Sequence, residues 1–211
     1  MDKFDIAVAM MSMTQMGDLL YDGTPKGAAA VRTGNDYGAK IMAEHPKRFG
    51  LFTGVPLPDI DGVMKEIEYG YDTLKADGIG IYTNDNHNRW PGDPYYEPMW
   101  QELNRRNAIV YMHPLAPQCC RDLNDSVPTA MNEFDFDIAH ASYAMPLAAL
   151  LKFAPPDQIL FGTDFSPEPI ESTVNELPQS GLSPQLMRAI ERGNAERLFP
   201  RFKASAAGTP R

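Results

Sequence analysis

The sequence predicts an α/β protein built on parallel strands, and two observations carry this prediction. Apolar, strand-like runs alternate with helix-like segments over residues 5–113. The apolar runs are continuous rather than alternating, which is typical of parallel strands covered on both faces. Right-handed crossovers join strand–helix–strand units of this kind. The pattern therefore favours either a barrel or a doubly wound sheet, and it leaves both open.

Four strands and three helices are expected in the first part of the chain. The expected strands are 5–13, 49–57, 79–83 and 108–113, and the expected helices are 24–46, 58–78 and 93–107. Thr24 is the expected N-cap of the first helix, and Pro25 suits the first helical position. Gly78 stands where the second helix would take a glycine C-cap.

The regular alternation stops after residue 113. A helix interrupted by Pro146 is expected over 142–154, and a strand over 158–164. Residues 183–199 read as two helical pieces that break at Gly193, with Asn194 as an N-cap. The small, polar tail is expected to be flexible.

Composition and charge exclude several classes of protein. The 19 basic and 28 acidic residues give a net charge of −9, which argues against nucleic acids and anionic membranes as partners. No apolar run approaches the roughly 18 residues of a transmembrane helix, and the N-terminus does not resemble a signal peptide. The two cysteines, Cys119 and Cys120, are adjacent and cannot cross-link distant parts of a fold. A reduced, cytoplasmic location is therefore expected.

A histidine and an aspartate stand at the ends of two expected strands. His113 ends the run 108–113, and Asp164 ends the run 158–164. Active sites of α/β barrels lie at the carboxyl ends of the strands. An imidazole and a carboxylate there suit Zn²⁺ or a similar divalent metal, and Asp164 could also move a proton beside it. In the other interpretation, His113 is hydrogen-bonded in the core and Asp164 caps the next element. The residues alone leave both interpretations open.

The segment 83–94 follows another strand end and brings His87, Arg89 and Trp90 to the same rim. Asp85 is a turn former, so a solvated loop is the favoured interpretation, with Trp90 as a candidate wall of a substrate site.

Four other residues with reactive side chains carry weaker signals. His140 follows a short apolar stretch, where a lone histidine is more often structural or exposed than functional. His45 lies at a helix end, where the helix dipole accounts for it. The adjacent Cys119 and Cys120 are poorly suited to bind one metal.

Several stretches together resemble a known family. They are HPKRFGLFTGVPLPDID, DGIGIYTN, GDPYYEPMWQELNRR, VYMHPLAP, PPDQILFGTDFSPEP and RGNAERLF. They are similar to the amidohydrolase-related decarboxylases, which include aminocarboxymuconate semialdehyde decarboxylase and the γ-resorcylate decarboxylases. SMTQMGDLLYDGT, YDTLKADGIGIYTNDN and STVNELPQSGLS resemble the 6-methylsalicylate decarboxylase-like members. The likeness implies one barrel domain over residues 1–202, followed by a flexible tail at 203–211.

The resemblance implies a metal-dependent (β/α)₈ TIM barrel. In that family an acidic-or-His-x-His pair on the first strand, a histidine in an HP motif and an aspartate in a GTD motif hold the metal. A further histidine in an HGG-like motif acts in catalysis. His113 matches the HP ligand and Asp164 matches the GTD ligand. The implied cofactor is Zn²⁺ or Mn²⁺, with Asp164 also catalytic.

The sequence departs from the family pattern in two places. The first strand with its x-His pair is absent, and so is the HGG segment. MNEFDFD and FDIAHASYAMP are joined directly around residues 135–138. The barrel is therefore expected to be incomplete, without its first and sixth strands. With two of four ligands left, metal affinity should fall steeply, and exposed sheet edges favour association into a homodimer.

The implied activity is non-oxidative decarboxylation of a small ortho-hydroxy aromatic acid such as 6-methylsalicylate. The aromatic ring of the substrate would pack on Trp90 and Phe165. One alternative is a metal-dependent hydrolase that acts on a lactone or an amide. Another is a non-catalytic, truncated remnant, inactive in this shortened form.

Overall fold

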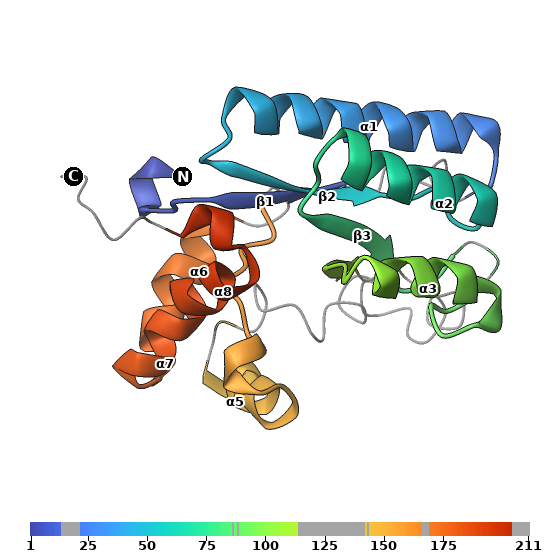
Figure 1. The fold of residues 1–211 in the computed structure, drawn as a ribbon. Coiled ribbons are helices and arrows are strands. Elements are labelled where there is room, and N and C mark those ends of the chain that lie inside the picture. Colours follow the sequence, from blue (N-terminus) through green and yellow to red (C-terminus); the bar gives the residue numbers. More distant parts are fainter. Residues whose placement is uncertain are drawn as a thin grey trace. The chain divides into compact units, whose positions relative to one another are not determined.

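The computed structural model describes residues 1–13, 22–85, 87, 89–113, 142, 144–165 and 169–203. The chain forms two compact units, Met1–Glu133 and Phe134–Arg211 (Figure 1). The single barrel domain expected over residues 1–202 stays a prediction, and most of the expected tail 203–211 lies outside the described residues.

The first unit contains a four-stranded parallel sheet. Its strands are β1 (Ala9–Ser12), β2 (Phe49–Gly54), β3 (Gly78–Tyr82) and β4 (Val110–His113). They pair in the order β1-β2-β3-β4, so each strand lies beside its neighbour in sequence. A doubly wound sheet reverses this order at a switch point. These four strands show no reversal, and the sheet therefore has the topology of part of a barrel.

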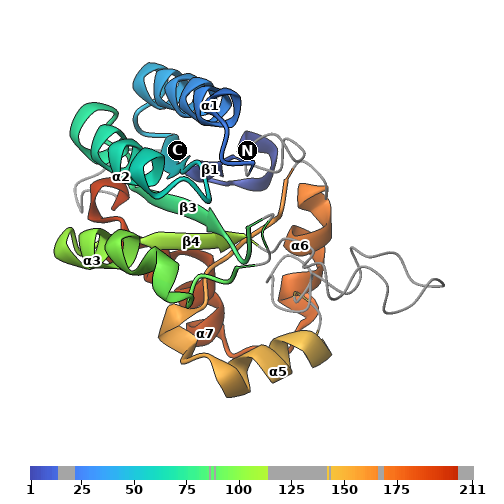
Figure 2. The same ribbon diagram turned by 90° about the vertical axis from the view of Figure 1, so that its right-hand side faces the viewer.

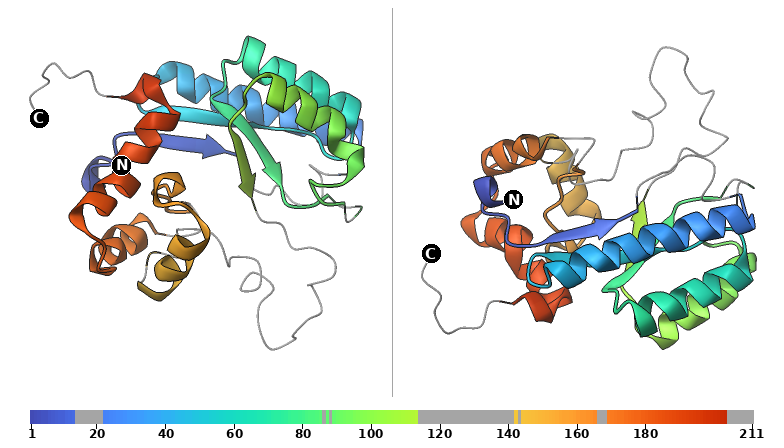
Figure 3. Two further views of the ribbon diagram at one scale, coloured as in Figure 1. Left: turned by 60° about the horizontal axis from the view of Figure 1, so that its bottom comes forward. Right: turned by 90° about the horizontal axis from the view of Figure 1, so that it is seen from above.

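Three helices cover one face of this sheet. They are α1 (Pro25–Glu44), α2 (Ile60–Glu68) and α3 (Glu97–Arg105). Figures 2 and 3 show them along the same side of the strands. A π-helical turn, Tyr69–Thr73, continues α2, and a 3₁₀ turn, Pro94–Tyr96, precedes α3. The buried core between helices and sheet includes Val31, Val63, Ile67, Ile79, Ile81, Met99 and Leu103.

The opposite face of the sheet carries aromatic side chains. The rings of Phe52 in β2 and Tyr111 in β4 stack across β3, with centroids 5.5 Å apart and planes 12° apart. Gly78 of β3 pairs in register with Phe52. A Cβ atom at Gly78 would lie only 2.7 Å from the Phe52 ring. Glycine at this position therefore makes room for the aromatic pair.

A buried amide ties two helices to the end of β2. Asn35 in α1 is fully buried. Its Nδ2 donates to the Gly54 carbonyl (3.0 Å) and to Glu66 of α2 (2.8 Å), and its Oδ1 accepts from the Gly54 N–H (2.8 Å). Arg32 completes the network by donating to Glu66 at 2.7 Å. The network holds β2 in place where the strand leaves the sheet.

Replacing Asn35 with alanine should lower the free energy of unfolding by about 3 kcal/mol, because buried polar partners would lose their hydrogen bonds. Urea titration followed by circular dichroism measures the change. The matched control is Lys40→Ala in the same helix, since the Lys40 side chain is 69% exposed and its loss should cost less than about 0.5 kcal/mol. Equal effects of the two changes would contradict the assigned role.

The second unit is helical in its described part. It contains α5 (Ala144–Phe153), α6 (Ile170–Glu176), α7 (Pro184–Arg188) and α8 (Asn194–Leu198). A π-helical turn, Ala189–Gly193, joins α7 to α8, and a 3₁₀ turn, Leu177–Gln179, follows α6. Its buried core is Leu147, Ile159, Leu177 and Ile190. None of the described helices is long and apolar enough to cross a membrane.

The expected helix start at Thr24 is confirmed, since its side chain accepts from the Gly27 N–H at 3.1 Å.

The predictions of helix ends and helix breaks at four other residues are wrong. Gly78 begins β3 and does not cap a helix. Pro146 lies in the first turn of α5, where its missing N–H leaves no bond unmade, so the helix is not interrupted. Gly193 has helical angles (φ −60°, ψ −38°), so α7 and α8 are not broken apart there, and Asn194 is inside the helical run rather than at an N-cap.

The run 158–164 forms no strand, which corrects a further prediction. Its backbone is extended at Ile159 (φ −87°, ψ 128°), but strand structure also needs a neighbouring strand. The Phe161 N–H instead donates to the carbonyl of Ile190 in the π-helical turn, at 3.0 Å. An apolar run predicts that a segment is extended and buried. It does not predict which groups will form hydrogen bonds with the backbone of that segment.

Candidate functional site

His113 lies at the carboxyl edge of the parallel sheet. It is the last residue of β4, and the Thr83 N–H donates to its carbonyl oxygen at 3.1 Å, so strand pairing continues to this end. It pairs in register with Tyr82 of β3. The imidazole lies 5.4 Å from the Tyr82 ring and 6.3 Å from the Tyr111 ring, measured between centroids. The side chain is half-buried on the sheet face that carries the rings of Phe52 and Tyr111.

Tyr82 is a fixed neighbour for this imidazole. Its side chain is buried, and its hydroxyl donates to the Met13 carbonyl beyond the end of β1, at 3.0 Å. The ring therefore cannot swing away without losing a hydrogen bond that spans the sheet. This contact limits the orientations open to His113.

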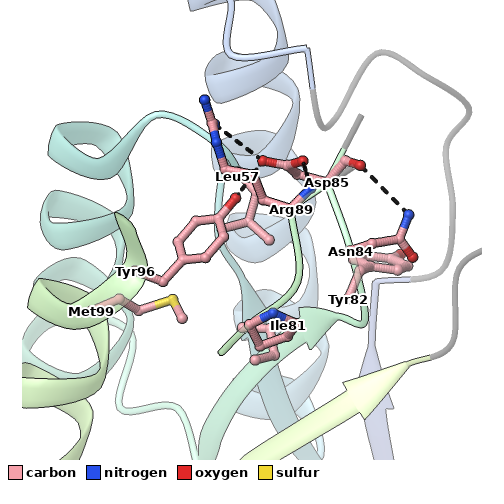
Figure 4. Close-up of a pocket in the computed structure, with 9 residues that line it drawn as sticks. Leu57, Ile81, Tyr82, Asn84, Asp85, Arg89, Tyr96 and Met99 are labelled. Atoms are coloured by element: carbon pink, nitrogen blue, oxygen red, sulfur yellow. Dashed lines mark hydrogen bonds and ion pairs between the residues drawn. The ribbon is translucent and has the colours of Figure 1, made fainter. Parts of the chain in front are cut away.

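Asp85 anchors the loop that follows β3. It is only 2% exposed. Its carboxylate accepts from the backbone N–H groups of His87 and Arg89, both at 2.8 Å. It also accepts from the Tyr96 hydroxyl at 2.5 Å, and Figure 4 shows Tyr96 pointing toward it. Burial, and then the hydrogen bond to Asp85, raise the pKa of Tyr96 far above its usual range, so it remains a neutral donor. The prediction of a solvated loop is therefore wrong for Asp85, whose carboxylate is buried. The sequence alone does not show which donors will surround a carboxylate.

The cavity beside Asp85 is too small for an aromatic acid. Leu57, Ile81, Tyr96 and Met99 are among its lining residues, and its volume is about 10 Å³. That is close to the minimum that holds one water molecule. The cavity belongs to the packing of the loop and is not a substrate site.

Removing the Tyr96 hydroxyl should destabilise the first unit through this anchor. Tyr96→Phe should lower the free energy of unfolding by about 2 kcal/mol, because the buried Asp85 carboxylate loses a donor. The adjacent Tyr95 is the matched control: it is 42% exposed and donates to the Pro58 carbonyl at 2.8 Å. Tyr95→Phe should cost less than about 1 kcal/mol. A larger loss for Tyr95 than for Tyr96 in thermal unfolding would contradict this account.

The other sequence candidates lie at exposed positions or outside the described residues. Trp90 is 47% exposed in the loop after β3, and Phe165 is 69% exposed in the second unit. Their role as walls of a substrate site stays a prediction. The His87 side chain is exposed. His140, Cys119 and Cys120 lie outside the described residues.

Asp164 belongs to the second unit and has an unusual backbone. Its φ of 47° places it in the left-handed region, which is uncommon for residues other than glycine, although aspartate is among those that tolerate it. Strained residues of this kind gather at functional sites. The next helix, α6, begins after Pro169 as its N-cap. Pro169, and not Asp164, is therefore the N-cap of α6.

The donor chemistry of these two residues fits a divalent metal. An imidazole nitrogen and a carboxylate oxygen are ligands that both Zn²⁺ and Mn²⁺ accept. Within the part of the chain that the structure describes, no three His, Cys, Asp or Glu side chains gather into a metal site. His113 lies in the first unit and Asp164 in the second, and that they share one metal stays a prediction.

The sheet order and the one-sided helices define the class of the protein as an α/β fold of the barrel type. The family model described as Amidohydrolase matches residues 3–137 and 131–201 of the chain. The chain belongs to the amidohydrolase family. The resemblance seen in the sequence motifs is thereby confirmed.

Two similar proteins align with nearly the whole chain. A 6-methylsalicylic acid decarboxylase of Penicillium expansum is 26% identical, over 95% of this chain and 84% of its own length. Another, from Aspergillus aculeatus, is 25% identical over 98% of this chain and 86% of its own length. A solved dihydroxybenzoic acid decarboxylase from Polaromonas sp. JS666, with bound manganese and the inhibitor 2-nitroresorcinol, has a TM-score of 0.81 at 18% identity. It covers 96% of this chain and 84% of its own, and the likeness shows the fold.

The comparisons also mark an internal join. The two pieces matched by the family model meet within residues 131–137. The alignment with the Penicillium expansum relative runs over 272 positions, whereas this chain has 211 residues. The relative therefore contains residues without a counterpart here. The join predicted around residues 135–138 agrees with the place where the matched pieces meet.

Proposed function

We propose that this chain is a metal-dependent decarboxylase of a small ortho-hydroxy aromatic acid, with 6-methylsalicylate as the representative substrate. One observation carries the proposal most directly. The chain aligns along 95% of its length with a 6-methylsalicylic acid decarboxylase. Similar solved structures are decarboxylases of other hydroxylated benzoic acids, which supports the substrate class.

His113 and Asp164 are the proposed metal ligands, with Mn²⁺ or Zn²⁺ as the metal. The support is the position of His113 at the carboxyl end of β4, the strained backbone of Asp164, and the manganese in the Polaromonas structure. When bound, such a metal supplies charge that orients the substrate carboxylate and phenolic oxygen and stabilises developing negative charge. With two protein donors, its affinity should be lower than in a site with three or four.

Asp164 has a second proposed role as the proton donor. Decarboxylation breaks the bond between the ring carbon and the carboxylate carbon, and CO₂ leaves. The electron pair of that bond stays on the ring carbon and takes a proton from the protonated Asp164 carboxyl group. This leaves Asp164 as the carboxylate that would bind the metal, and a water molecule returns the proton before the next turnover. Trp90 and Phe165 would pack on the aromatic ring, and their exposed rings leave apolar surface for it.

Two other functions have specific support. The family is described as Amidohydrolase, which favours hydrolysis of an amide or a lactone. The internal join favours a remnant without activity.

One experiment separates these three functions. The purified chain, incubated with Mn²⁺, is given 6-methylsalicylate, an aryl lactone and an aryl amide in parallel. We expect CO₂ and a methylphenol in equal amounts from the first and no turnover of the others. Turnover of the lactone or amide alone would favour the hydrolase. A folded, monodisperse chain that turns over none of them would favour the remnant.

We further propose a cytoplasmic location, a homodimer, and no nucleic-acid or membrane partner. The net charge of −9 and the two adjacent cysteines support the location and the partners. Light scattering on the purified chain tests the dimer directly.

A further inference from the structure

The segment that leads to Asp164 is held by a helix. Asn194 of α8 is 4% exposed. Its Nδ2 amide donates to the Pro156 carbonyl at 2.9 Å and to the Ile159 carbonyl at 2.8 Å. Both hydrogens of the amide are therefore used, and both acceptors lie in the chain that precedes Asp164.

A wide helical turn supplies a third bond to the same segment. In the π-helical turn Ala189–Gly193, the Asn194 backbone N–H donates to Ala189, five residues back. The Ile190 carbonyl would accept that N–H in a regular α-helix. It accepts the Phe161 N–H instead, at 3.0 Å. The π-helical turn thus leaves the Ile190 carbonyl available to the segment that precedes Asp164.

These bonds lie close to a residue that needs external support. Phe161 is three residues before Asp164, whose φ of 47° is a conformation that persists only where the surroundings enforce it. Ile159 and Ile190, which lie beside these bonds, are both buried in the core of the second unit. The segment is therefore fixed by hydrogen bonds and by packing up to Phe161.

We propose that Asn194 is a positioning residue for Asp164. Through the Pro156 and Ile159 carbonyls, and with the Ile190 carbonyl beside it, Asn194 fixes the segment that presents the Asp164 carboxylate to a divalent cation. The cation is that of the proposed function, on which this inference rests. Asn194 itself touches neither metal nor substrate.

The test compares Asn194→Ala and Asn194→Ser with Ser142→Ala. Serine keeps one donor where asparagine has two, so it is the milder change. Ser142 is the matched control, because it is fully buried in the same unit and its hydroxyl donates to Glu176 of α6 at 2.6 Å, not to a carbonyl of the Asp164 segment. Amide hydrogen exchange of the segment is measured in the metal-free chains, and Mn²⁺ affinity is measured by calorimetry. Thermal unfolding of all three reports any general loss of stability.

We expect exchange at Phe161 and the residues up to Asp164 to speed up at least about tenfold in Asn194→Ala, less in Asn194→Ser, and not in Ser142→Ala. Mn²⁺ affinity should fall about 10- to 100-fold in Asn194→Ala, as when the support of a metal ligand is lost. Unchanged exchange in both Asn194 variants would overturn the inference, and so would a loss of affinity no larger than in Ser142→Ala. If the unaltered chain binds no Mn²⁺, the proposed metal site fails, and exchange alone decides the role of Asn194.

Discussion

Replacing His113 with alanine should lower the affinity of the chain for Mn²⁺ by at least about 100-fold, because it removes one of two proposed protein donors. Isothermal titration of the metal-free chain measures the change, and the metal content of purified protein provides a second reading. His113 ends β4, and its imidazole contacts the rings of Tyr82 and Tyr111. Since alanine also removes these contacts, thermal unfolding must show that the variant is folded.

His87→Ala is the matched control for this change. The His87 side chain is exposed, and the residue contributes its backbone N–H, not its ring, to the Asp85 anchor. Its replacement should leave Mn²⁺ affinity within about twofold of the unaltered chain. If His113→Ala kept full affinity and His87→Ala or His140→Ala lost it, the metal would use a different histidine. The assignment of His113 would then be wrong.

Replacing Asp164 with asparagine should lower kcat/KM for 6-methylsalicylate by about 10³-fold or more. The amide has the size of the carboxyl group, but it cannot donate a proton to the ring carbon, and general acid catalysis is worth about 10²- to 10⁴-fold. It is also the poorer metal ligand, which adds to the loss. The release of CO₂, followed at increasing substrate concentration, measures the change.

Two comparisons separate the roles of Asp164. Asp157→Asn changes an exposed carboxylate in the same unit, paired with Arg197 at 3.6 Å, and should leave kcat/KM nearly unchanged. Raising Mn²⁺ to saturation in Asp164→Asn should restore binding but not kcat, since the proton donor is still missing. Full recovery of kcat at high Mn²⁺ would show that Asp164 is a ligand and nothing more.

Local chemistry in the sequence determined much of the first unit. Continuous apolar runs predicted the four strands of the sheet. Threonine followed by proline predicted the helix start at Thr24, and the bond from the Gly27 N–H confirms it. The HP and GTD motifs of the family pointed to His113 and Asp164. Such motifs can be recognised from sequence because their residues are adjacent in the chain. The family itself is confirmed by the match over most of the chain.

Long-range contacts decided the rest. Strand order distinguished a barrel-type sheet from a doubly wound one, and order is a property of pairs of strands, not of any one run. The run 158–164 lost its expected strand because its Phe161 N–H bonds to a helix. Asp85 and Asn194 read as a turn former and a cap, yet both are buried anchors. A polar side chain looks the same in sequence whether water or a buried carbonyl is its partner, and only the folded chain brings that partner within hydrogen-bond distance.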